Sequence, residues 1–344
     1  MILQNTFFKE ECLGVHRSIV QDDISINQKI QAIISNSLLL YTYKYTDKGS
    51  NCLMYIFLQD KYWDIILLSN NGITQYTIKP ILTAFQRLFM KPKQYQIQKA
   101  LFIQMNDFKE IKSPSIVVLQ QFLEFENNSQ KQRKIGILYQ KCDQNTEQQM
   151  LQNTGSFENF EQFLSILGQR IQITNGLTYY TGGLDAKGRD GDVLYTHLLD
   201  TELAFHVSTW LKHVNNDDQQ LIKKRHIGND NIIILFQEQG SVYDLSDFTS
   251  QMTCVWVVIE QISSVSLNEQ EILVSVKIFY KTFIEFAGQE IPPELTEKIL
   301  VNKNFLATFL LQKLLDISKS IWCSGEFQLK KQRQRISLID KVGQ

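Results

Sequence analysis

The feature that most constrains the fold is an alternation of two residue patterns along the second part of the chain. Short runs of β-branched and aromatic residues, typical of strands, alternate with segments whose apolar residues recur at helical spacing. Helices are predicted over Phe157–Leu167, before Gly168, and over about Asn304–Ile321. Strands are predicted at Lys134–Gln140, Val193–Leu198, Leu203–Thr209, Ile232–Phe236, Cys254–Glu260 and Glu271–Tyr280. Interleaved strands and helices favour an α/β fold, with a mixed sheet and helices on both of its faces.

The first 130 residues predict a smaller α/β subdomain. Turn-forming residues separate its strand-like runs, and a helix is expected to begin at Lys79. The predicted strands are Leu38–Tyr45, Cys52–Gln59 and Trp63–Leu68. The segment from Glu126 to Arg133 is polar throughout, which is typical of a linker, and a basic stretch from Lys330 to Arg335 follows the last predicted helix. The predicted domains are therefore residues 1–128 and residues 129–338.

Composition narrows the class of protein. A chain of 344 residues, 43% of them hydrophobic, can bury the cores of two domains. Its 35 Lys and Arg against 36 Asp and Glu give a formal charge of −1, which argues against a surface built as a whole for nucleic acid or anionic lipid. Its five cysteines form no Cys-x-x-Cys pair, which argues against a disulfide framework and a cysteine zinc site.

The sequence also bears on location. No apolar run approaches the ~20 residues of a membrane span. Acidic residues occupy positions 10 and 11, where a signal peptide needs apolar ones. We expect a cytoplasmic protein without an integral membrane segment, and the sequence leaves peripheral recruitment to membranes open.

Two patterns that would indicate a bound metal or nucleotide are incomplete. No metal-ligand spacing relates the four clustered histidines, His197, His206, His213 and His226. His206 lies in a predicted strand and is expected to be a hydrogen-bonded structural residue. Gly183 and Gly188 have the spacing of a P-loop, but Arg189 and Asp190 stand where Lys and Ser or Thr would hold phosphate and magnesium. The sequence therefore predicts neither a metal nor a cofactor, and Gly182 and Gly183 are expected to form a tight turn.

The most unusual stretch runs from Lys223 to Asp230, with the sequence KKRHIGND. Its cations suit the C-terminal end of a short helix, where the helix dipole is negative. The Gly-Asn-Asp corner that follows is the kind of position at which a polar side chain is held out from a scaffold. From composition alone, the simpler interpretation is a helix C-cap with solvated lysines.

With this stretch the chain resembles the Rap GTPase-activating protein family, whose Rap/Ran-GAP domain is related to that of tuberin. The block KKRHIGND followed by Ile232–Phe236, Gln237 and Glu238 is similar to the family signature KRHIGND…FQE. Further blocks match in order at Ile135–Lys141, Tyr180–Asp185, Phe205–Thr209 and Phe309–Leu315, so the resemblance covers roughly residues 130–325. It implies a Rap-GAP catalytic domain in residues 129–338.

The resemblance also implies a mechanism and a partner. Relatives supply an asparagine, called the asparagine thumb, to position the hydrolytic water in a Rap-like GTPase in its GTP-bound state. In this chain the thumb is Asn229, with His226 and Gly228 in supporting roles. A carboxamide both donates and accepts, so it can orient a water without abstracting its proton. The cations expected to dock on the GTPase are Lys223, Lys224, Arg225 and Lys141. Such a protein completes the active site of its partner and is not an enzyme in its own right.

Several alternatives stay open. Where relatives carry an apolar residue, this chain has Asn231, so a shift of the helix end would present the wrong asparagine. The client GTPase could be Rheb or Ral, as for tuberin and the Ral-directed activators, and a catalytically inactive GTPase-binding scaffold is a further alternative. The resemblance also implies homodimerisation through residues 1–128. No nucleic-acid partner is expected, because the basic stretch lacks interleaved aromatic residues for stacking.

Overall fold

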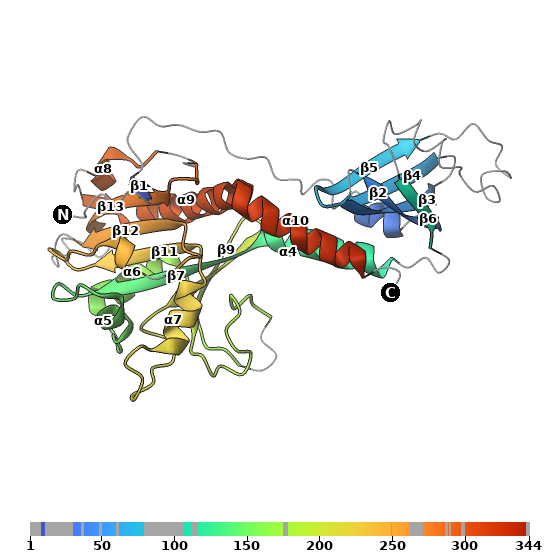
Figure 1. Ribbon diagram of the computed structural model, residues 1–344. Coiled ribbons are helices and arrows are strands. Elements are labelled where there is room, and N and C mark those ends of the chain that lie inside the picture. Colours follow the sequence, from blue (N-terminus) through green and yellow to red (C-terminus); the bar gives the residue numbers. More distant parts are fainter. Residues whose placement is uncertain are drawn as a thin grey trace. The chain divides into compact units, whose positions relative to one another are not determined.

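The computed structural model of the chain forms two compact units (Figure 1). One unit comprises Met1–Val20 and Gln130–Ser324, and the other comprises Gln21–Ser129 and Gly325–Gln344. Within them the structure describes residues 8–10, 30–35, 38–47, 50–59, 62–78, 106–111, 116–174, 178–248, 250–261, 271–285, 288, 290–296 and 300–341. The division at residue 130 lies next to the predicted domain limit, whereas residues 325–338 group with the N-terminal part of the chain.

The larger unit contains a mixed sheet with the strand order β1-β13-β12-β11-β7-β10-β9-β8, and β14 pairs with β13. Strands β10, β7, β11 and β12 run parallel to one another, and the remaining pairs are antiparallel. The strands are β1 (Phe8–Glu10), β7 (Gln132–Gln140), β8 (Gln169–Ile171), β9 (Val193–Leu198), β10 (Thr201–Val207), β11 (Ile232–Gln237), β12 (Val255–Gln261), β13 (Glu271–Lys281) and β14 (Leu300–Asn302). The six strands predicted in this part of the chain are confirmed.

Helices cover both faces of this sheet, as predicted. The helices of the unit are α5 (Glu147–Leu151), α6 (Glu158–Leu167), α7 (Leu221–Gly228), α8 (Pro293–Thr296) and α9 (Lys303–Cys323), with a short 3₁₀ turn at Leu245–Asp247. On one face Met150 of α5 and Ile227 of α7 pack into a core with Leu138 of β7. On the other face Phe160 of α6 stacks on Tyr139, the next residue of the same strand. Alternate residues of a strand face opposite sides, so β7 is buried between two helical layers.

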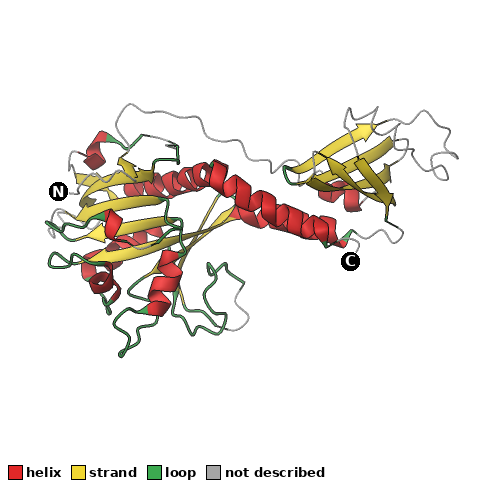
Figure 2. Ribbon diagram, viewed as in Figure 1, coloured by secondary structure: helices red, strands yellow, loops and turns green. Residues whose placement is uncertain are grey.

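The smaller unit contains an antiparallel sheet, whose strands are yellow in Figure 2. The strand order is β5-β4-β3-β2-β6. Its elements are β2 (Leu38–Asp47), β3 (Ser50–Gln59), β4 (Tyr62–Ser69), β5 (Gly72–Ile78), β6 (Asn106–Glu110), α4 (Val117–Lys131) and α10 (Gly325–Asp340). Leu119 and Phe122 of α4 and Ile339 of α10 pack with Tyr55 and Phe57 of β3 in one core. The three strands predicted here are confirmed, and the helix expected from Lys79 lies outside the described residues.

The prediction of a linker from Glu126 to Arg133 is wrong. Helix α4 continues to Lys131, and β7 begins at the next residue. Glu126 is buried, and its carboxylate lies 2.8 Å from Arg335 Nε and 2.8 Å from Lys331 Nζ, both on α10. Burial alone would raise the pKa of Glu126, but the two cations together hold that pKa below its usual value. The charge of Glu126 is neutralised by residues about 200 positions away in the sequence. The segment itself therefore gives no local sign that Glu126 is buried.

Candidate functional site

The candidate site is built on α7, which is labelled in Figure 1. This helix has little apolar surface of its own. Leu221 is exposed and Ile227 is buried in the core. At its start, Gln220 adopts a left-handed backbone conformation with φ of 46°, and its amide donates to the carbonyls of Val214 and Asp217 at 2.6 Å. The Asp217 carboxylate accepts the backbone N–H of Leu221 at 2.8 Å, which caps the first turn. Polar anchors, more than an apolar face, therefore hold this helix in place.

The expectation that Lys223 docks on a partner is wrong. Its side chain is fully buried, and Nζ donates to the carbonyl oxygens of Leu151 at 3.0 Å and Asn153 at 2.9 Å, where α5 ends. Burial lowers the pKa of Lys223 to about 8. An ammonium that binds the free carbonyls of a helix end is an internal anchor between α5 and α7.

The other three predicted docking cations have different surroundings. The Arg225 side chain is 60% exposed, and Lys224, which is 39% exposed, lies 3.2 Å from Glu147. Lys141 follows the last residue of β7, with its Nζ 4.9 Å from the ring centroid of Phe157. Gly136 of β7, which packs against Asp230, lies five residues before Lys141. Five residues of extended chain span roughly 17 Å, which separates Lys141 from the end of α7. The structure thus places Lys224 and Arg225 on the helix of Asn229 and sets Lys141 apart.

Asn229 is exposed at the end of α7, whereas Ile227, two residues before it, and Asp230, which follows it, are buried. Its backbone N–H donates to the carbonyl of His226 at 3.2 Å. The carbonyl of Gly228 accepts a hydrogen bond from Ser250 Oγ at 2.5 Å. These two contacts hold the peptide group that precedes Asn229. The N–H of Asp230 donates to the carbonyl of Ile227 at 3.1 Å and holds the peptide group that follows, while the side chain of Asn229 stays at the surface.

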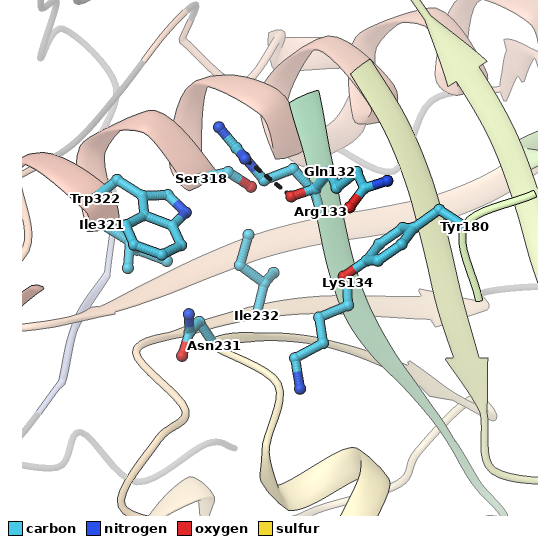
Figure 3. Close-up of a pocket in the computed structure, with 9 residues that line it drawn as sticks. All are labelled: Gln132, Arg133, Lys134, Tyr180, Asn231, Ile232, Ser318, Ile321 and Trp322. Carbon is cyan, nitrogen blue, oxygen red and sulfur yellow. Dashed lines mark hydrogen bonds between the residues drawn. The ribbon is translucent and has the colours of Figure 1, made fainter. Parts of the chain in front are cut away.

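Asn231 has a different environment, which distinguishes the two asparagines. It lines a small pocket of about 120 Å³ together with Lys134, Ile232, Ile321 and Trp322 (Figure 3). Its Oδ1 atom is buried, and its backbone carbonyl accepts from the N–H of Cys254 at 2.7 Å. Asn229 is therefore the asparagine whose amide is presented at the end of the helix.

Behind the helix end lies a buried pair that the sequence did not connect. His206 of β10 and Asp230 are both fully buried, and His206 Nδ1 lies 2.7 Å from Asp230 Oδ2. Lys134 Nζ lies 3.4 Å from the other carboxylate oxygen. Gly182 makes room for the ring, because a Cβ there would lie 2.5 Å from His206 Nε2, and its φ of 69° suits glycine. The structural role predicted for His206 and the turn predicted at Gly182 are confirmed.

His226 connects this region to the loop that precedes β9. It is 8% exposed, its ring centroid lies 5.5 Å from that of His206, and its Nε2 lies 3.0 Å from Asp190 Oδ2. Burial and the nearby His206 together hold the pKa of His226 below its usual value, so the imidazole is neutral at neutral pH. Three motif blocks contribute to this cluster, through Gly182, His206 and the pair His226 and Asp230. Asp190 and Lys134 lie outside the blocks, so the motifs alone did not indicate these contacts.

Among the parts of the chain that the structure describes, no group of His, Cys, Asp and Glu side chains could hold a metal ion. No helix within the same described ranges is long and apolar enough to cross a membrane.

Comparison with known proteins identifies the family. The family model Rap/ran-GAP matches residues 150–337, which is more than half of the chain. The chain therefore belongs to the Rap/ran-GAP family, and this membership supports a GTPase-activating function.

Several relatives match the same part of the chain. It is 33% identical over 207 residues to signal-induced proliferation-associated 1-like protein 1 of Mus musculus, covering 59% of this chain and 11% of that protein. It is 35% identical over 207 residues to signal-induced proliferation-associated 1-like protein 2 of Homo sapiens, covering 59% of this chain and 12% of that protein. It is 32% identical over 216 residues to GTPase-activating Rap/Ran-GAP domain-like protein 3 of Gallus gallus, covering 61% and 22%. The match thus spans about a tenth to a fifth of these relatives' length.

A solved structure, described as that of the TSC2 GAP domain, is also similar. It is 29% identical to this chain, with a TM-score of 0.46, and the match covers 58% of this chain and 98% of that one.

Proposed function

We propose that this chain is a GTPase-activating protein for a Rap-like small GTPase and that it supplies the carboxamide of Asn229 to the partner's active site. The observation that carries the proposal is the exposure of Asn229 at a helix end whose backbone is fixed on both sides. A group that acts in trans must be accessible, and it must also lose little freedom when the partner binds. The arrangement of Asn229 meets both conditions.

The chemistry of GTP hydrolysis suits this side chain. Catalysis requires that the attacking water be positioned in line and that charge on the phosphates be stabilised. A carboxamide accepts one hydrogen of the water and donates to an oxygen, so it can orient the nucleophile without removing its proton. A carboxylate at the same place would bring negative charge towards the γ-phosphate. The protein in this proposal completes a partner's active site and holds no substrate of its own.

Arg225 and Lys224 form the proposed docking surface beside Asn229. Both are partly neutralised, because Lys224 lies 3.2 Å from Glu147 and Arg225 lies 3.5 Å from Asp190. Their contribution is therefore mainly to the rate of encounter with an acidic GTPase surface. Lys141 joins the proposed interface only where the GTPase also reaches the end of β7. Homodimerisation through residues 1–128 stays a prediction.

The test is phosphate release from GTP-loaded Rap, Rheb and Ral, each mixed with the purified chain. We expect acceleration of Rap, and Asn229→Ala to reduce it at least ~10²-fold, because one positioning group is lost. Asn231→Ala is the matched control, since that asparagine lines the pocket, and it should keep most of the activity. Acceleration of Rheb or Ral instead of Rap would change the client. GTPase binding without acceleration would indicate a scaffold, and undiminished activity of Asn229→Ala would overturn the proposal.

A further inference from the structure

The loop from Gly182 to Asp192 reaches α7 through one carboxylate. Asp190 Oδ2 lies 3.0 Å from His226 Nε2 and 3.5 Å from Arg225 Nη2. The same oxygen accepts the backbone N–H of Asp185 at 3.1 Å. The Asp190 side chain is only 14% exposed, so water competes weakly for these contacts. A single side chain thus holds two consecutive residues of the helix.

The donors in this cluster can be assigned from chemistry. A carboxylate only accepts hydrogen bonds, so His226 Nε2 carries the hydrogen that it donates to Asp190. Arg225 Nη2 lies 3.1 Å from that nitrogen, which then has no lone pair to offer, and the guanidinium interacts with Asp190 instead. Asp190 therefore fixes both the tautomer and the orientation of the His226 ring.

The backbone that carries Asp190 is itself fixed. Its carbonyl accepts the N–H of Lys212 at 2.9 Å, and the next residue, Gly191, forms an isolated bridge with Leu211. Gly191 has a φ of 115°, and a Cβ there would lie 2.4 Å from the carbonyl oxygen of Trp210. Only glycine fits this close approach, and the bridge together with the hydrogen bond from Lys212 holds the loop backbone against residues 210–212.

His226 passes this restraint to the exposed amide. Its ring is held by Asp190, and its carbonyl accepts the backbone N–H of Asn229 at 3.2 Å. We propose that Asp190 is a positioning residue, which sets the orientation of Asn229 through His226. The inference rests on the proposed function, because it gives Asp190 a role only if Asn229 enters a GTPase.

The first test is steady-state activation of GTP-loaded Rap by Asp190→Asn. We expect kcat to fall about 10- to 100-fold, because small misplacement of a catalytic group is costly, while the KM for the GTPase changes less than about twofold. The matched control is Asp192→Asn, which changes the same residue type in the same loop at a carboxylate that pairs with Arg170 at 2.8 Å. The control should keep the wild-type kcat. Thermal unfolding of each variant corrects for any unfolded fraction.

The second test is a double-mutant cycle with His226→Gln. If Asp190 acts through His226, the double variant is no slower than the slower single variant, whereas independent roles would multiply the two losses. Repeating the cycle with Asp190→Ser keeps the comparison valid if one variant folds poorly. Multiplied losses, or a wild-type kcat for Asp190→Asn, would overturn the inference.

Asn229→Ala, measured alongside, separates this inference from the proposed function. If that variant is inactive and Asp190→Asn is fully active, only the positioning role fails. If Asn229→Ala is itself fully active, the proposed function fails and the role of Asp190 fails with it.

Discussion

Helices α7 and α10 carry similar basic runs, 223–226 and 330–335, yet their cations have different environments. On α10, Lys331 and Arg335 are mostly buried and both contact Glu126 within the smaller unit. On α7, Arg225 is 60% exposed, and Asn229 follows at the surface. The comparison shows that composition alone does not identify a docking helix. A helix can dock on a partner only where its cations remain accessible and are not buried against a carboxylate of the same unit.

The comparison also applies within α7. Lys223 and Arg225 lie two residues apart, but Lys223 is fully buried and binds backbone carbonyls, while Arg225 faces solvent. The first half of the helix is anchored to α5. The second half is held by Asp190, which contacts His226, and by the buried Asp230, whose N–H donates to the carbonyl of Ile227. The helix is therefore rigid at both ends, and the residues available to a partner lie between these anchors and at Asn229.

The largest effect on stability is expected at Glu126, in the cluster of α10. Glu126→Ala leaves Arg335 buried without its carboxylate partner, and loss of one member of such a buried pair costs about 3–5 kcal/mol. Urea unfolding, followed by a signal from the smaller unit, should show this decrease in the unfolding free energy. The matched control is Glu124→Ala, an exposed glutamate on the same helix, which should change the unfolding free energy by less than about 0.5 kcal/mol. Equal effects of the two substitutions would show that the cluster does not stabilise this unit.

The next largest effect is the contribution of Lys223 to the pH dependence of the unfolding free energy. Its pKa in the folded state is lowered to about 8, so the folded protein binds this proton less well than the unfolded chain does. The cost of burying the charge is fully present below about pH 8 and is lost as pH rises towards the unfolded value. The shift corresponds to about 3 kcal/mol. The stability difference between the wild type and Lys223→Met should therefore grow in favour of the wild type from pH 8 to 10.

The measurement for Lys223 is the unfolding free energy of the wild type and of Lys223→Met at several pH values between 8 and 10. A slope for Lys223→Met equal to that of the wild type would show that Lys223 does not titrate in this range.

The smallest expected effect concerns Arg225. Arg225→Gln should raise the KM for GTP-loaded Rap by a few-fold, because exposed charges act mainly on association, and the effect should shrink at high salt. Arg333→Gln removes the same charge from an exposed position on α10 and should leave the KM unchanged. If the two variants raise KM equally, net charge matters and the location of Arg225 does not.

Much of the fold could be predicted from the sequence, and part of the site could not. The strands followed from runs such as Ile232–Phe236, whose β-branched residues are buried on both faces of the parallel part of the mixed sheet. Glu126 and Lys223 were misinterpreted, because polar side chains in polar segments give no local sign of burial. Their partners lie far away in the sequence, at Arg335 and Leu151.

The position of Asn229 could be predicted because it lies in a contiguous motif. The contacts behind it could not be predicted in the same way. Asp190 lies in a stretch that was considered only as an incomplete P-loop, and its link to His226 spans 36 residues. Such contacts depend on which strands become neighbours, and spacing in one sequence does not contain that information.

The most direct test of the central claim is Asn229→Asp, which keeps the shape of the side chain and removes its donor. The purified variant should still bind GTP-loaded Rap, because the docking surface is unchanged. In single-turnover phosphate release it should show almost no acceleration. Full acceleration by this variant would contradict the claim that a carboxamide from this chain orients the hydrolytic water.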